Sequence, residues 1–130
     1  MVTVLDLPEV ERRAAQGAQL LEVLPEADYR KEHLPGARNI PIDRLTREAA
    51  ERDLDPRRPV IVYCYDTECD LSARAAARLE AFGFRSVFDY RGSKTEWLAM
   101  HRPAEGTVPE RERAGALARP AATCAPDTPL

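Results

Sequence analysis

Cys64 is the residue whose type and setting best suit covalent chemistry. It ends an apolar run, Val60-Ile61-Val62-Tyr63, that is typical of a buried strand, and an alanine-rich segment of helical period follows shortly after it. The thiolate is the reactive form of cysteine, and loop N–H groups together with the positive end of a helix favour that anion. The pattern predicts a nucleophilic cysteine between a strand and a helix. The alternative is a buried cysteine that only fills the core.

The segment after Cys64 is acidic and carries a second thiol. It consists of Tyr65, Asp66, Thr67, Glu68, Cys69, Asp70, Leu71 and Ser72. Its carboxylates would raise the pKa of a neighbouring thiol and repel anions such as thiosulfate, unless they point into solvent, where salt screens them. Asp70 also suits the N-cap of the following helix. We interpret Cys69 either as a resolving thiol that closes a disulfide with Cys64 or as a bystander packed under the loop.

Residues outside the loop are candidates for supporting roles. Arg91 and Lys94 follow the last predicted strand, at the same sheet edge as Cys64, and are either contacts for an anion or ordinary surface charges. We expect His33 to form structural hydrogen bonds and Trp97 to pack in the core. The scattered histidines and the two loop cysteines lack metal-ligand spacing, so we expect neither a metal nor a cofactor.

Strands and helices alternate along the chain with short connections. Strands are predicted over residues 1–5, 19–24, 37–40, 60–64 and 86–90, and helices over residues 8–18, 26–32, 43–52, 71–82 and 94–100. This alternation predicts an α/β domain with a mainly parallel sheet and helices on both faces. Ligands of such sheets bind at the carboxyl ends of the strands, which is the place of Cys64.

Composition indicates one globular domain. The chain has 130 residues and a net charge of −3, which gives no reason to expect a nucleic-acid or membrane partner. No apolar run approaches the roughly 20 residues of a membrane span, and the first residues do not look like a signal peptide. Cys64, Cys69 and Cys124 do not form the pattern of a disulfide scaffold. We therefore expect a cytoplasmic protein, with a domain over residues 1–104 and a flexible or loosely packed tail over residues 105–130.

A set of separated motifs occurs in a distinctive order. The most specific segment is His33-Leu34-Pro35-Gly36-Ala37-Arg38-Asn39-Ile40-Pro41, which lies between Leu20-Leu21-Glu22-Val23 and the strand that ends in Cys64. Together with the alanine-rich helix and residues 87–97, this set resembles the single-domain rhodaneses, over residues 18–104. The resemblance implies a five-stranded, mainly parallel α/β fold. It also implies that Cys64 takes sulfur from a donor, holds it as a persulfide and passes it to cyanide or a thiol.

The chain departs from the family pattern around the site. Glu22-Val23-Leu24 stands where the family usually has Asp-Val-Arg, so we expect a charged support near the site to be missing. If Ser72 matches the family's serine, the loop is longer than usual, and it contains neither arginine nor glycine. Arg91-Gly92-Ser93 stands where many members have Gly-Gly.

Three functions fit these observations. The first is a thiosulfate or, more readily, persulfide sulfurtransferase, whose partners are a small sulfur donor or a protein persulfide and a thiol acceptor. The second is a catalytically weak or inactive binding or regulatory module. The third and least favoured is a phosphatase or arsenate reductase of the same fold, because phosphate chemistry needs an arginine to clamp the oxygens and this loop has none.

Overall fold

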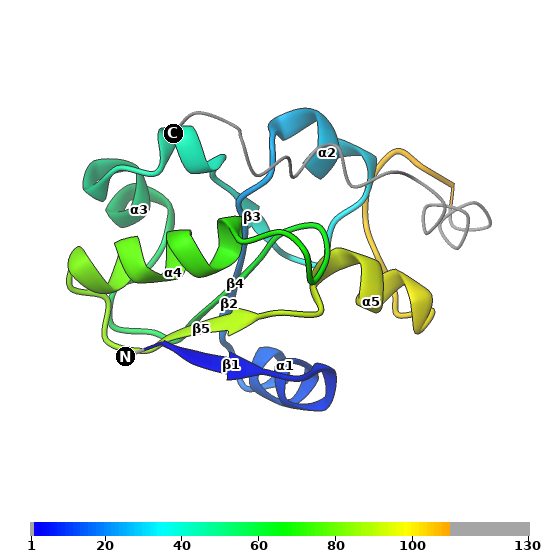
Figure 1. Cartoon of the computed structure of the whole chain (residues 1–130), viewed down its shortest axis with the longest axis horizontal. Helices are drawn as coiled ribbons and strands as arrows, with labels where there is room; N and C mark the ends of the chain where they lie inside the picture. The colour runs from blue at the N-terminus through cyan, green and yellow to red at the C-terminus, as the bar shows by residue number, and fades with distance from the viewer. Residues whose placement is uncertain (1, 110–130) are drawn as a thin grey trace.

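A five-stranded parallel sheet forms the centre of the computed structural model, which describes residues 2–109 (Figure 1). The strand order is β1-β5-β4-β2-β3. The strands are β1 (Thr3–Leu5), β2 (Gln19–Glu22), β3 (Arg38–Asn39), β4 (Val60–Tyr63) and β5 (Val87–Tyr90). The helices are α1 (Leu7–Ala15), α2 (Glu26–Lys31), α3 (Arg47–Asp53), α4 (Leu71–Ala81) and α5 (Ser93–Ala99), with the 3₁₀ turn η1 (Ile42–Arg44). The predicted α/β class and the parallel sheet are confirmed.

Strand β4 is the middle of the sheet. All four of its residues are completely buried, and Ile61 is paired with Leu20 of β2 on one side and with Phe88 of β5 on the other. A strand covered on both faces requires a continuous apolar run, which is the pattern of residues 60–63. Cys64 therefore follows the most enclosed strand of the fold, at the carboxyl edge of the sheet.

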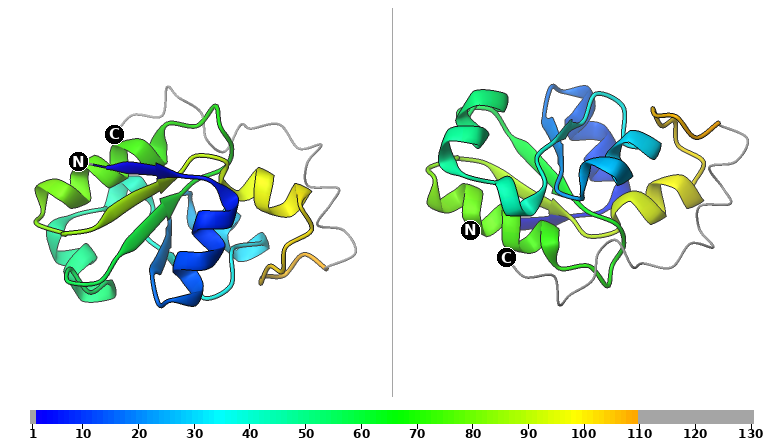
Figure 2. Two further views of the ribbon diagram at one scale, coloured as in Figure 1. Left: turned by 90° about the horizontal axis from the view of Figure 1, so that it is seen from below. Right: turned by 90° about the horizontal axis from the view of Figure 1, so that it is seen from above.

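Two apolar clusters cover the two faces of the sheet. Side chains alternate along β4, so Val60 and Val62 belong to the cluster packed by α3 and α4, while Ile61 and Tyr63 belong to the cluster packed by α1 and by Trp97 of α5. Figure 2 shows the same division, with α3 and α4 across the sheet from α1. The sheet with helices on both faces is thus held by two separate cores.

Helix boundaries follow local capping. The helix predicted over residues 43–52 has either Asp43 or Thr46 as its expected cap; residues 42–44 form η1, and α3 begins after Thr46. Thr46 caps α3 by accepting a hydrogen bond from the amide of Ala49 at 3.1 Å. Helix α4 begins and ends close to the predicted positions, and Gly83 beyond it adopts φ +102°.

Residues 101–108 are fastened to the domain, and they include residues 105–108 at the start of the segment predicted to be a flexible or loosely packed tail. The indole N–H of Trp97 donates to the carbonyl of Pro103 at 2.7 Å, and His33 and Glu105 exchange two backbone hydrogen bonds of 2.8 and 2.9 Å. The amides of the two residues after Gly106 donate to carbonyls at the end of α2. The rest of the predicted tail, residues 110–130 with Cys124, lies outside the described residues.

No helix within residues 2–109 has the length and apolarity needed to cross a membrane.

Candidate functional site

Cys64 is completely buried at the carboxyl end of β4. Its sulfur lies 3.5 Å from the hydroxyl oxygen of Ser72 in the first turn of α4, and 3.5 Å from the carbonyl oxygen of Cys69. The hydroxyl of Ser93 lies on another side at 3.9 Å. Cys64 is a free cysteine in this structure. Its sulfur is therefore surrounded by oxygens of the loop and of two helices.

The start of α5 holds the backbone of Cys64 from both sides. The amide of Cys64 donates to the Ser93 hydroxyl at 3.0 Å, and the amide of Lys94 donates to the carbonyl of Cys64 at 3.2 Å. The Ser93 hydroxyl in turn donates to the carbonyl of Tyr90 at 2.8 Å, which links the ends of β4 and β5. Ser93 reaches this position with φ 57°, a left-handed conformation that costs a residue with a Cβ about 1 kcal/mol.

The acidic loop is shaped by Asp66. Its carboxylate accepts hydrogen bonds from the amides of Glu68 at 3.0 Å and Cys69 at 3.1 Å, an Asx turn. Thr67, Glu68 and Asp70 are exposed. Asp70 stands at the predicted N-cap position of α4, but its side chain makes no capping hydrogen bond and instead faces Arg74 at 3.4 Å. The Asp66 carboxylate therefore stabilises the loop backbone, whereas those of Glu68 and Asp70 face solvent.

Burial raises the pKa of the Cys64 thiol. Hydrogen bonding to Ser72 and Ser93 and to the amide of Tyr65 opposes this rise, because these groups stabilise the thiolate. The sequence left two possibilities for the loop carboxylates, which either raise the pKa of this thiol or point into solvent. The leading cause is the loss of water around the sulfur, and not repulsion by the three loop carboxylates.

A buried ion pair joins α5 to β2 beneath the site. The ammonium of Lys94 lies 2.9 Å from the carboxylate of Glu22, and the two side chains are 1% and 0% exposed. The Tyr63 hydroxyl donates to the same carboxylate at 2.8 Å and accepts from the amide of Leu34 at 3.1 Å. Burial raises the pKa of Glu22 to about 7, against the opposing effects of Lys94 and Tyr63. The charged support expected to be missing is therefore present, with Lys94 as its cation.

Asp89 is a second buried carboxylate near Cys64. It lies on β5 and is 1% exposed, and its Oδ1 atom has no hydrogen-bond partner in the described part of the chain. Arg91 approaches its Oδ2 atom at 3.7 Å and is 48% exposed. Arg91 and Lys94, the two candidate anion contacts, are thus both directed at carboxylates of this chain.

Sequence reasoning missed the roles of Glu22, Ser93 and Asp89. The available signal for Asp89 was a single carboxylate inside an otherwise apolar and aromatic strand, where a charge needs an explanation. Glu22 gave the same signal, because it is a single carboxylate at the end of the mainly apolar strand β2. No pattern in the sequence indicated that Lys94, 72 residues further along the chain, would pair with Glu22.

The remaining candidates take structural positions. His33 pairs through its Nδ1 atom with the carbonyl of Tyr29 at 2.7 Å and stacks on the Tyr29 ring, so its structural role is confirmed. Trp97 is 6% exposed in the core, also as predicted. Tyr65 is buried, at 5% exposed. Cys69 is 2% exposed in the same apolar cluster as Cys64, and its role as a resolving thiol stays a prediction.

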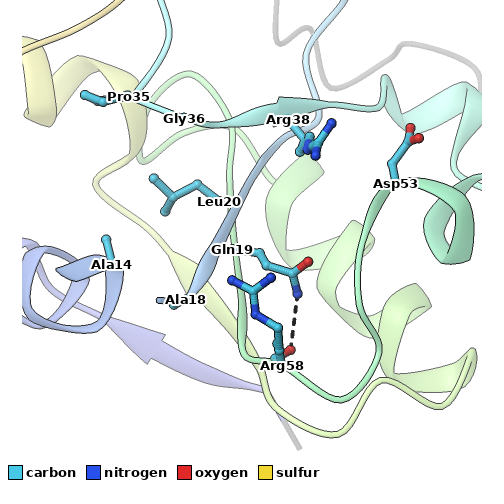
Figure 3. Close-up of a pocket in the computed structure, with 9 residues that line it drawn as sticks. All are labelled: Ala14, Ala18, Gln19, Leu20, Pro35, Gly36, Arg38, Asp53 and Arg58. Carbon is cyan, nitrogen blue, oxygen red and sulfur yellow. Dashed lines mark hydrogen bonds between the residues drawn. The ribbon is translucent and has the colours of Figure 1, made fainter. Parts of the chain in front are cut away.

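A cavity of about 280 Å³ lies at the opposite edge of the sheet (Figure 3). Gln19 at the start of β2, Arg58 just before β4, and Arg38 of β3 contribute to its lining. No residue of the loop after Cys64 lines it, so it is separate from the thiol site. Within residues 2–109, no group of three or more His, Cys, Asp or Glu side chains is arranged to hold a metal ion.

Comparison with known proteins identifies the scaffold around this thiol. A family model for the rhodanese-like domain matches residues 6–100. The chain belongs to the rhodanese-like family. This rhodanese-like domain is 34% identical over 92 residues to the uncharacterized protein YqhL of Bacillus subtilis, an alignment that covers 70% of each chain. It is 32% identical over 100 residues to the HTH-type transcriptional regulator Rv0324 of Mycobacterium tuberculosis, covering 77% of this chain but 43% of the regulator. The chain thus spans less than half the length of that relative.

Solved structures show the same rhodanese fold. The rhodanese-like domain of the Alr3790 protein from Anabaena sp. matches with a TM-score of 0.71 and 27% identity, covering 83% of this chain and 82% of that one. A thiosulfate sulfurtransferase from Pseudomonas aeruginosa matches with a TM-score of 0.67 and 28% identity, covering 82% of this chain and 20% of that one. The structural neighbours of this rhodanese-like domain therefore include a named sulfurtransferase.

Proposed function

We propose that this rhodanese-like domain is a sulfurtransferase that carries sulfane sulfur on Cys64. The observation that supports the proposal most directly is the setting of the thiol. Its sulfur lies between the Ser72 and Ser93 hydroxyls, while α5 fixes the backbone on either side of it. The Ser72 hydroxyl can donate its proton to this sulfur, which stabilises an anionic sulfur, whether it is a thiolate or a persulfide.

The transfer consists of two displacements at sulfur. The thiolate of Cys64 attacks the outer sulfur of a persulfide donor, a new S–S bond forms, the donor's S–S bond breaks, and the donor leaves as a thiolate. An acceptor thiolate or cyanide then attacks the outer sulfur of the Cys64 persulfide, and Cys64 leaves with the bonding electron pair. No external oxidant or reductant takes part.

The charges around the site favour a persulfide over thiosulfate as the donor. Lys94 is neutralised by Glu22 and Arg91 lies against Asp89, while Glu68 and Asp70 present negative charge to solvent at the loop. A dianion such as thiosulfate meets repulsion here without a dedicated cation. At equal, subsaturating concentrations we expect faster turnover with cysteamine persulfide, whose ammonium offsets the negative charge of its sulfur, than with thiosulfate. Equal or faster turnover with thiosulfate would contradict this preference.

Intact mass spectrometry tests the activity itself. After incubation with glutathione persulfide, we expect the protein to gain the mass of one sulfur atom, to lose it on addition of cyanide, and to release thiocyanate. The variant Cys64→Ser keeps the size of the side chain and is expected to gain nothing. A wild-type protein that gains no sulfur from either donor would refute the proposal.

That negative result would favour the second candidate, a binding or regulatory module. The complete burial of Cys64 and the similarity to part of a transcriptional regulator are the observations on its side. Phosphatase or arsenate reductase chemistry gains no support, because the loop has no arginine and the nearest one in α4, Arg74, pairs with Asp70.

A further inference from the structure

The cavity at the edge of the sheet opposite Cys64 exists because β3 is short. Strand β3 begins opposite Leu21 of β2, so Gln19 and Leu20 of β2 have β4 on one side and no strand of the described chain on the other. Both residues line the cavity, as does Arg38 at the start of β3 (Figure 3). Its volume of about 280 Å³ is close to the lower end of the range of small-molecule sites, about 300–1,000 Å³. The cavity therefore suits a small metabolite.

Arg58 is held in the wall of this cavity at both ends of the residue. Its carbonyl accepts from the Gln19 side chain at 3.4 Å, and the same side chain exchanges hydrogen bonds of 2.7 and 3.0 Å with the backbone of Asp55. The guanidinium of Arg58 donates to the carbonyl of Gly17 at 2.7 Å, which leaves its other N–H groups for a ligand. The carboxylate of Asp55 is directed at Arg57, at 3.5 Å. Arg58 is thus positioned before any ligand arrives.

The positive charge of the cavity is not balanced by its own lining. The side chain of Arg38 makes no hydrogen bond or ion pair within residues 2–109, and that of Arg58 makes no ion pair there. Asp53 is the carboxylate among the described lining residues, and its Oδ1 atom already faces Arg52 at 3.2 Å. Two arginines against one shared carboxylate favour the binding of an anion.

The other walls of the cavity indicate what the rest of the ligand contains. Ala14 of α1, Leu20 and Pro35 present hydrocarbon, against which a short carbon chain packs. Arginine binds carboxylate and phosphate groups alike, because its planar N–H groups match pairs of oxygens. The Asp53 carboxylate is an acceptor at the same cavity, which favours a ligand that also carries a hydroxyl or amino group.

We propose that this cavity is a binding site for a small organic acid. The carboxylate or phosphate group of the ligand contacts Arg38 and Arg58, and its hydroxyl or amino group donates to Asp53. No residue of the loop after Cys64 lines the cavity, so the ligand is not a substrate of the thiol. The inference goes beyond the proposed sulfur transfer and does not depend on it.

An NMR titration of the full chain at constant ionic strength tests the site with three probes of one carbon skeleton. Glycerate carries a carboxylate, glycerol 3-phosphate carries a phosphate, and glycerol carries neither. We expect both acids to shift the backbone amide signals of cavity residues such as Leu20 and Arg38 until they saturate, and glycerol to leave them unchanged. The tighter acid identifies which oxyanion the site prefers. Saturation with neither acid, or equal shifts with glycerol, would overturn the proposal.

Arg38→Gln is the decisive variant, because this side chain has no described contact whose loss would unfold the protein. Without its charge-assisted hydrogen bonds we expect both acids to bind about tenfold or more weakly, and the same for Arg58→Gln. Arg44→Gln removes an exposed arginine of η1 that does not line the cavity, and it should keep the wild-type affinity. Circular dichroism verifies folding, and R38Q alone decides if R58Q does not fold. Equal affinities in R38Q, R44Q and the wild type would refute the site.

The contribution of Asp53 is measured as selectivity. We expect the wild type to bind glycerate more tightly than propionate, which lacks the hydroxyl groups, and Asp53→Ala to lose this preference. An unchanged preference would contradict the role given to Asp53.

The variant Cys64→Ser separates this inference from the proposed function, since it is expected to bind glycerate as the wild type does. If glycerate binds but the wild type gains no sulfur from any donor, the inference stands and the proposed function fails. If sulfur is gained on Cys64 but neither acid binds, the proposed function stands and the inference fails.

Discussion

At the scale of single residues, Ser93 combines a strained backbone with two hydrogen bonds. Its hydroxyl accepts from the amide of Cys64 and donates to the carbonyl of Tyr90, while its φ of 57° lies in the left-handed region. The Gly-Gly pair that many members of the family have at this place would adopt that conformation at no steric cost but would lack the hydroxyl. In this chain, therefore, a serine with a strained backbone takes the place of a glycine, and its hydroxyl holds the backbone of Cys64.

Two substitutions separate the hydroxyl from the strain. Ser93→Ala keeps the strain and leaves the buried amide of Cys64 without its partner, so we expect it to lower the free energy of unfolding by about 1–3 kcal/mol. Ser93→Gly loses the same hydrogen bonds but relieves the strain, and is expected to be about 1 kcal/mol more stable than S93A. Urea denaturation measures both differences. If S93A proved as stable as S93G, the φ angle would not be a source of strain.

At the scale of elements, the Glu22–Lys94 pair ties α5 to β2. Helix α5 supplies both groups that hold the backbone of Cys64, and its own position is fixed by an ammonium that also donates to the carbonyl of Asp28 at 3.1 Å. Removing one member of a buried ion pair leaves an uncompensated charge, which typically destabilises a protein by about 3–5 kcal/mol. The pair therefore couples the stability of α5 to the geometry of the site.

The pKa of Glu22 predicts how stability depends on pH. Its folded value of about 7 lies above its ordinary value of 4.5, so the folded protein binds this proton more tightly than the unfolded chain. The resulting stabilisation is fully present below the ordinary value and is lost as the pH rises through about 7. We expect the free energy of unfolding to fall over this range by up to about 3 kcal/mol.

Urea denaturation at a series of pH values measures this slope. The double variant E22Q/K94M removes both charges together and leaves no unpaired ion, so its stability should vary less with pH than that of the wild type. Asp89, whose pKa burial also raises, is present in both proteins and cancels in the comparison. Identical slopes in the two proteins would show that Glu22 does not gain affinity for its proton on folding.

At the scale of the whole molecule, the segment after α5 closes the domain over α2. Backbone hydrogen bonds join Glu105 to His33, and the amide of Gly36 donates to the Glu105 side chain at 3.1 Å. Gly106 makes this close approach possible, because its φ is +136° and a Cβ there would collide with the backbone carbonyl of Lys31. The fold thus includes residues well beyond its last helix.

Gly106→Ala tests the importance of this closure. The added methyl group must push the segment off α2, and we expect a loss of about 1–3 kcal/mol in the free energy of unfolding. Gly36→Ala is the matched control, since Gly36 also has a positive φ, of +74°, but has open space where the methyl group would go. We expect G36A to cost only the conformational strain, about 1 kcal/mol. Thermal and urea denaturation should therefore rank G106A below G36A, and the reverse order would contradict the packing seen here.

The extent to which the sequence predicts this molecule depends on how local each interaction is. The run Val60–Tyr63 predicts the central strand and the place of Cys64, because burial on both faces is encoded by consecutive residues. The pairing of Glu22 with Lys94 joins residues 72 apart in the sequence, and no local pattern carries that information. The anchoring of residues 105–108, the start of the predicted tail, was missed for a related reason. Its hydrogen bonds are mainly between backbone groups, which a polar composition neither predicts nor excludes.

Cys64 is completely buried, so a sulfur donor of the proposed enzyme can reach the thiol only if the covering loop moves aside. Every donor would then share this opening step before its own chemistry begins. Where the opening is slower than the sulfur transfer, donors of different charge are expected to reach the same limiting rate at saturating concentration. The closed loop would also shield a persulfide on Cys64 from water and oxidants, which suits the storage of a reactive sulfur atom.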